Sequence, residues 1–162
     1  MRVGVVSDTH NQLSNVARIV ELLNRAGVER VVHTGDITQA KTLEVLARLD
    51  APLHGVFGNN DAGERAALEA AAARYAMRLV DPPLELVWAE RRILVVHDPR
   101  DLGAARETKH EVALHGHTHR RTIERSDGRL LFNPGECAGH VAGRNAVGVV
   151  DLVTLETEIL SF

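Results

Sequence analysis

Five short polar segments of the chain combine the residue types that bind divalent metal ions. They carry aspartate, histidine and asparagine side chains and contain no cysteine. Nitrogen and oxygen donors without thiolate suit Mn, Fe, Ni, Zn or Co ions, and affinity order alone does not choose among these metals. In chain order the segments are Asp8-Thr-His10, Gly35-Asp36, Gly58-Asn-Asn-Asp61, His97 and Gly116-His-Thr-His119.

Most of these segments have a simpler explanation when each is taken alone. Asp8 is the type of residue that caps a helix, and Gly35-Asp36 is typical of a turn. Gly58-Asn59 also reads as a turn, and a single histidine such as His97 is more often packed or exposed than bound to a metal. No one of these segments therefore defines a metal site.

The histidine-rich segment is more specific. His117 and His119 are separated by one residue directly after an apolar run, and such pairs seldom have a purely structural role. His115, which precedes them, is expected to pack or to hydrogen-bond locally. This segment therefore favours a metal site over incidental polar residues.

The elements that must position these residues alternate in the first half of the chain. Apolar runs rich in valine and leucine predict strands, and leucine and alanine at helical spacing predict helices, with Gly27 as the stop signal of the first helix. Each predicted strand ends in one of the polar segments. The expected strands are residues 2–6, 31–32 and 53–57, and the expected helices are residues 13–24, 43–49 and 64–73.

The second half of the chain consists mainly of predicted strands, with Asp127-Gly128 as a hairpin turn signal. Strand–helix units followed by strands predict two packed sheets flanked by helices rather than one doubly wound sheet. Strand ends along one edge of a layered fold converge on a single cleft, so the five polar segments are expected to meet there. The expected strands are residues 84–88, 92–96, 112–115, 122–125, 129–132 and 147–152.

Length and composition limit the function classes. The 162 residues suit one domain, spanning residues 1–162, and the hydrophobic content of 44% supports a substantial core. The net charge of -3 and the scattered basic residues argue against stable nucleic-acid binding. No apolar run is long enough for a signal peptide or a membrane span, so we expect a cytoplasmic protein. The sequence leaves open whether it forms a homo-oligomer.

The ordered set of five segments resembles the calcineurin-like metallophosphoesterase superfamily, and in particular its compact bacterial and archaeal phosphodiesterases. The resemblance extends from the first strand to at least Asn133-Pro-Gly135. It implies an α/β fold, a four-layer αββα sandwich of two mixed β-sheets flanked by helices. It also implies a dinuclear metal-dependent phosphodiesterase that hydrolyses small phosphodiesters by attack of a metal-bridging hydroxide.

The resemblance also assigns roles to individual residues. Two divalent metal ions are expected as cofactors, and manganese is favoured. One ion is expected on Asp8, His10 and His119, and the other on Asn59, His97 and His117, with Asp36 bridging the two. The residues assigned to the catalytic step are Asp36, Asn59, Asn60 and Asp61.

Three positions depart from the family's usual pattern. Asn60 stands where many relatives have a histidine that protonates the leaving group, and an amide cannot act as a general acid near neutral pH. We therefore expect a preference for aryl or cyclic nucleotide phosphodiesters, which have good or strained leaving groups, over alkyl monoesters. Asp98 replaces a glycine and Glu136 replaces a small residue, and the sequence does not predict their effects.

Other residues near the expected cleft have weaker assignments. Arg100, Arg106 and Arg144 are candidates for binding a phosphate, although exposed loop arginines are usually only solvated. Cys137 is the only cysteine and is assigned no role.

Two other functions are compatible with parts of this pattern. A non-catalytic interaction scaffold would keep the fold, but it would be expected to lose ligands, and every expected ligand position holds Asp, Asn or His. A nuclease would require a basic surface or an extra domain, and the sequence shows neither. An α/β domain with incidental histidines does not explain the order of the five segments.

Overall fold

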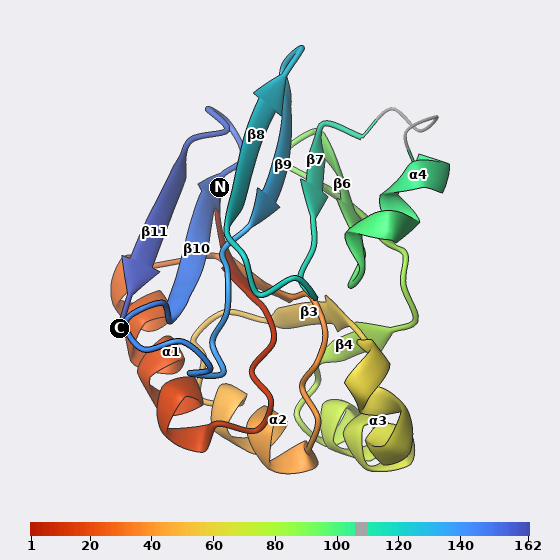
Figure 1. Cartoon of the computed structure of the whole chain (residues 1–162), viewed down its shortest axis with the longest axis vertical. Coiled ribbons are helices and arrows are strands. Elements are labelled where there is room, and N and C mark those ends of the chain that lie inside the picture. The colour runs from red at the N-terminus through yellow and green to blue at the C-terminus, as the bar shows by residue number, and fades with distance from the viewer. Residues whose placement is uncertain (106–109) are drawn as a thin grey trace.

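The computed structural model describes residues 1–105 and 110–162, and its core is a pair of packed β-sheets (Figure 1). One sheet has six strands in the order β11-β10-β1-β2-β3-β4. Strands β1 to β4 are parallel to one another, β10 pairs antiparallel with β1, and β11 pairs antiparallel with β10. The strands are β1 (Arg2–Val6), β2 (Arg30–His33), β3 (Leu53–Val56), β4 (Arg78–Val80), β10 (Ala146–Asp151) and β11 (Thr157–Ser161).

The second sheet has five strands in the order β5-β6-β7-β9-β8. Strands β6, β7 and β9 are parallel, whereas β5 and β8 pair antiparallel at the two edges. Both sheets are therefore mixed, as predicted. The strands are β5 (Leu84–Trp88), β6 (Arg91–Val95), β7 (Val112–Leu114), β8 (Thr122–Ser126) and β9 (Arg129–Asn133).

Three helices cover the outer face of the six-stranded sheet (Figure 1): α1 (Leu13–Ala26), α2 (Ala40–Leu46) and α3 (Arg65–Arg74). Gly27 ends α1 in a left-handed conformation with φ of 64°, and its N–H donates to the Asn24 carbonyl, which confirms the predicted stop signal. The other outer layer is thin, because among the described residues only a short 3₁₀ turn (Pro99–Asp101) and α4 (Leu102–Ala105) lie beside the five-stranded sheet. None of the described helices is long and apolar enough to span a bilayer.

Two apolar clusters hold the layers together. Alternation along β1 explains both, because Val3 and Val5 point between the sheets while Val6 points toward the helices. Val16, Ile19 and Leu23 of α1 complete the cluster on the helix side. The core is thus built mainly from valine and leucine, as the low aromatic content of 3% requires.

The structure corrects some element boundaries. The predicted helix at residues 43–49 begins earlier and ends at Leu46. The sequence did not predict β4, β11 or the 3₁₀ helix Asn59–Glu64. That 3₁₀ helix matters for the candidate site, because its first three residues are Asn59, Asn60 and Asp61.

Candidate metal centre

The candidate ligands come together at one edge of the sandwich. They lie in the loops that follow the carboxyl ends of β1, β2, β3, β6 and β7, so both sheets contribute. Parallel neighbours end at the same edge, and this brings residues more than a hundred positions apart into contact. The N–H of His117, for example, donates to Asp8 Oδ2 over 3.1 Å.

The first donor set gathers around Asp8. Its Oδ1 atom lies 4.0 Å from His10 Nε2 and 3.6 Å from His119 Nε2. The two imidazole rings are stacked with centroids 5.2 Å apart. His10 Nε2 also lies 3.4 Å from Asp36 Oδ2.

The second donor set gathers around Asn59. Its Oδ1 atom lies 3.0 Å from His97 Nε2 and 3.0 Å from His117 Nδ1. These two ring nitrogens are 3.2 Å apart, and His97 Nε2 lies 3.4 Å from Asp36 Oδ1. Asp36 therefore presents one carboxylate oxygen to each set. The two sets adjoin there, since donor atoms of Asp8, Asp36 and His97 lie within 4.8 Å of one another.

The chemistry of these atoms fits divalent cations. His10 Nε2 is buried and has no hydrogen-bond partner in the part of the chain that the structure describes. Asp8 and Asp36 are 0% and 2% exposed, and within the described part of the chain their ion pairs are with histidines only. Buried carboxylates without a compensating positive charge are strongly unfavourable, so bound cations would stabilise this arrangement.

The backbone of the ligand loops is unusual. Five of the candidate ligands have a positive φ, which is rare for residues other than glycine and costs about 1–3 kcal/mol each. Hydrogen bonds between loops hold this conformation, such as those from Asp8 N to the Gly35 carbonyl and from His10 N to the Asp36 carbonyl. The five residues are Asp8 (51°), His10 (43°), Asp36 (57°), His117 (66°) and His119 (55°).

Asn60 and Asp61 contact Asp36 in different ways. Asn60 Nδ2 donates to Asp36 Oδ2 over 2.7 Å, which places its amide beside the candidate ligands. Asp61 is fully buried, and its carboxylate accepts from the backbone N–H groups of Asp36, Thr38 and Gly58. Burial raises the pKa of Asp61, against the lowering effect of these hydrogen bonds. Asp61 thus ties the Asp36 loop to the start of the Asn59 segment.

Three of the candidate ligands have a partner on the ring nitrogen that faces away from the donor sets. His97 Nδ1 lies 2.9 Å from the Thr34 carbonyl, which leaves Nε2 as the lone-pair nitrogen toward Asn59. His119 Nδ1 lies 3.2 Å from Glu136 Oε2, and His117 Nε2 lies 3.6 Å from Asp98 Oδ2. Such partners orient metal-binding histidines and set their tautomer.

Glu136 and Asp98 therefore lie beside the candidate ligands His119 and His117, which the sequence did not predict. Glu136 is 1% exposed. Burial raises its pKa, but hydrogen bonds from His119, Val141 and His140 more than offset this and lower it overall. The pKa of Asp98 falls to about 2, mainly because the Arg100 side chain donates to it. Both side chains are thus carboxylates at neutral pH.

A cleft of about 550 Å³ opens beside the second donor set. Asn59, His97 and His117 line it together with Arg100, whose guanidinium is paired with Asp98. Arg144 is exposed but does not line this cleft, and Arg106 lies outside the described residues. Cys137 is buried, its Sγ lies 3.2 Å from the Ala146 carbonyl, and burial raises its pKa to about 12.

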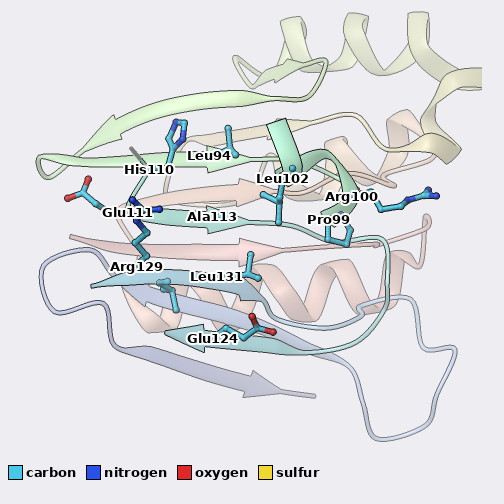
Figure 2. Close-up of a pocket in the computed structure, with 12 residues that line it drawn as sticks. Leu94, Pro99, Arg100, Leu102, His110, Glu111, Ala113, Glu124, Arg129 and Leu131 are labelled. Atoms are coloured by element: carbon cyan, nitrogen blue, oxygen red, sulfur yellow. The ribbon is translucent and has the colours of Figure 1, made fainter. Parts of the chain in front are cut away.

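A second hollow of about 540 Å³ lies on the thinly covered outer face of the five-stranded sheet (Figure 2). Its floor includes Leu94, Ala113 and Leu131. Apart from Arg100 it shares no lining residue with the first cleft, and none of the candidate metal ligands reaches it. The candidate metal ligands therefore lie away from this second hollow.

Comparison with known proteins agrees with the fold and the motifs. The sequence model of the calcineurin-like phosphoesterase superfamily domain matches residues 1–157. The protein is therefore an enzyme of the phosphoesterase class. It belongs to the calcineurin-like phosphoesterase superfamily, which confirms the resemblance that the five segments carry.

Individual relatives extend this result. The chain is 31% identical over 155 residues to a phosphodiesterase of Methanocaldococcus jannaschii, covering 93% of each protein. The solved structure of an archaeal phosphodiesterase superposes with a TM-score of 0.91 at 30% identity over 100% of both chains. A phosphoesterase from Escherichia coli has a TM-score of 0.73 at 22% identity, over 94% of this chain and 89% of the other. At that identity the likeness concerns the fold alone.

Proposed function

We propose that the protein is a phosphodiesterase that uses two divalent metal ions to hydrolyse small phosphodiesters. The observation that carries the proposal is the position of Asp36, whose two carboxylate oxygens face two separate donor sets. We assign one ion to Asp8, His10 and His119. The other is assigned to Asn59, His97 and His117, with Asp36 shared. The similarity to an archaeal phosphodiesterase over nearly the whole chain supports the proposed activity.

Residues of the chain hold the candidate ligands in position beside the cleft. When bound, two divalent cations activate water as a nucleophile and offset the charge of the phosphoryl group. Asp61 binds the backbone N–H groups of Asp36 and Gly58, and this fixes the position of Asp36 relative to Asn59. His97 and His117 line the cleft beside Asn59, and we therefore assign the scissile phosphate to that edge.

Asn60 determines which substrates are expected. Its side-chain amide donates to Asp36 Oδ2 and cannot give a proton to a leaving alkoxide near neutral pH. We therefore infer that aryl and 2′,3′-cyclic nucleotide phosphodiesters are cleaved faster than alkyl monoesters, which need that proton more. Similar turnover of both classes would contradict this inference. Manganese is the favoured metal, and the donor set also accommodates Fe, Ni, Zn and Co.

Metal reconstitution tests the proposal. The protein is purified without metal, and hydrolysis of an aryl phosphodiester is measured after adding Mn²⁺, Ni²⁺, Zn²⁺ or Mg²⁺, with bound metal quantified in parallel. Asp36→Asn and His117→Ala are expected to lower activity by at least about 100-fold, because they remove donors from metal ions that contribute several kcal/mol to transition-state stabilisation. Asp127→Asn, in the distant β8–β9 turn, is the matched control and keeps activity.

The outcome separates an enzyme from an interaction scaffold. Metal-dependent activity that is lost in both site variants and kept in the control supports the proposal. A folded protein that binds no metal and cleaves no phosphodiester would instead favour a scaffold with this fold.

A further inference from the structure

The loop after β9 brings an additional histidine to the first donor set. Gly135, Gly139 and Gly143 have positive φ values of 108°, 76° and 74°, and they let the chain turn back over the site. His140 lies in this loop, and its ring centroid is 5.6 Å from that of His10 and 5.1 Å from that of His119. One nitrogen from each of the three rings lies within 4.8 Å of the others.

Buried Glu136 anchors this loop to the site. Its carboxylate accepts from the backbone N–H groups of His140 over 3.3 Å and Val141 over 2.7 Å. The same carboxylate lies 3.2 Å from His119 Nδ1. One buried group therefore sets the orientation of the His119 ring and the position of the His140 backbone together.

A second contact fixes the start of the loop. Asn15 Nδ2 on α1 donates to the Cys137 carbonyl over 2.7 Å. The segment that carries His140 is thus tied at two points to elements that are themselves packed in the core. The backbone that carries His140 is therefore held in place by the fold, while the His140 ring itself is exposed beside His10 and His119.

We propose that His140 is a further ligand of the metal ion assigned to Asp8, His10 and His119, an inference that rests on the proposed metal centre. His10 Nε2 is buried and has no hydrogen-bond partner among the described residues, so it is available to bind a cation. A third neutral imidazole adds a nitrogen donor that suits Zn, Ni, Fe and Co better than Mg or Mn. The site at Asp8 is therefore expected to prefer Zn, Ni, Fe or Co more strongly than the site at Asn59 does.

Cobalt binding tests the assignment without relying on activity. Metal-free protein is titrated with Co²⁺ by calorimetry, and the visible absorption of the bound ion is recorded. His140→Ala and His140→Gln are compared with the wild type and with Val141→Ala, which alters an exposed neighbour in the same loop while keeping its backbone bond to Glu136. Circular dichroism checks that each variant is folded.

The wild type is expected to bind two ions. In both His140 variants one of the two is expected to bind at least about tenfold more weakly, because losing even an indirect partner of a metal ligand costs 10–100-fold. Its absorption bands should change, while the second ion and the Val141→Ala protein stay as in the wild type. Two unchanged affinities and an unchanged spectrum in the His140 variants overturn this inference alone. A wild type that binds no ion overturns the proposed metal centre as well.

Discussion

Acid sensitivity of the folded state should originate in large part at His33, a buried histidine directly before the Asp36 loop. Its side chain is fully buried at the end of β2. Its Nδ1 atom accepts from the Gly35 N–H over 3.1 Å, and its Nε2 atom lies 3.1 Å from Thr9 Oγ1. Burial disfavours the protonated ring and lowers the pKa of His33 to about 3.

The size of the effect follows from the pKa values of the two states. The unfolded chain takes up a proton near its ordinary pKa of 6.5, whereas the folded chain does not until the pH approaches about 3. Stability from His33 is therefore fully present above pH 6.5 and is lost as the pH falls below that value. Between about pH 8 and pH 5 the loss is about 2 kcal/mol, and this figure hardly changes if the folded pKa is one unit higher.

Urea unfolding of metal-free protein at about pH 8 and about pH 5 measures this loss directly. In His33→Asn the amide oxygen can still accept from the Gly35 N–H, but the ionisable ring is gone. Other histidines with a lowered pKa are present in both proteins, so their contributions cancel in the comparison. The variant is expected to be less stable at the higher pH and to lose about 2 kcal/mol less on acidification than the wild type. An equal loss in both proteins would refute the argument.

Two further substitutions probe the geometry of the centre. In Gly116→Ala the new Cβ would clash with Ser7 Oγ and lie 2.7 Å from Thr34 Oγ1 and 2.8 Å from Asp8 Oδ2, so these side chains must shift. Because Asp8 is one of them, we expect at least about tenfold weaker metal binding in calorimetry. Gly63→Ala, with no atom within 4 Å of its Cβ, is the control, and equal binding by both variants would contradict the prediction. Asp98→Asn removes the carboxylate 3.6 Å from His117 Nε2 and should weaken one of the two ions by about 10–100-fold. Unchanged Ni²⁺ affinity in that variant would show that Asp98 does not orient the ring.

The sequence predicted most of the fold because its main elements have strong local patterns. The valine runs of β1 and β10 and the helical spacing in α1 are each sufficient to identify the element. β4 and β11 were missed because both are partly exposed edge strands without a continuous buried apolar run. Their place is decided by pairing with distant strands, which no local pattern encodes.

The candidate ligands were identifiable because residue type and position at strand ends are both visible in the sequence. The left-handed backbone at Asp8 and His117 was not, since it depends on hydrogen bonds between loops. The places of Glu136 and His140 were also missed, because the loop that carries them folds back over residues near the start of the chain. The three glycines at positions 135, 139 and 143 were the feature of the sequence that could have indicated that this loop turns back.

Each donor set takes side chains from both sheets, and this gives the proposed cations a second consequence. Asp8 and His10 follow β1 of one sheet, whereas His119 follows β7 of the other. Asn59 follows β3, and its partner His97 follows β6. A cation bound in either set would therefore link the two sheets at the end of the sandwich where the apolar cluster between them gives way to polar loops. Free metal at about 100 times its dissociation constant would add about 2.7 kcal/mol to the free energy of unfolding. The resistance of this enzyme to heat and proteolysis would then vary with the metal supply of its surroundings.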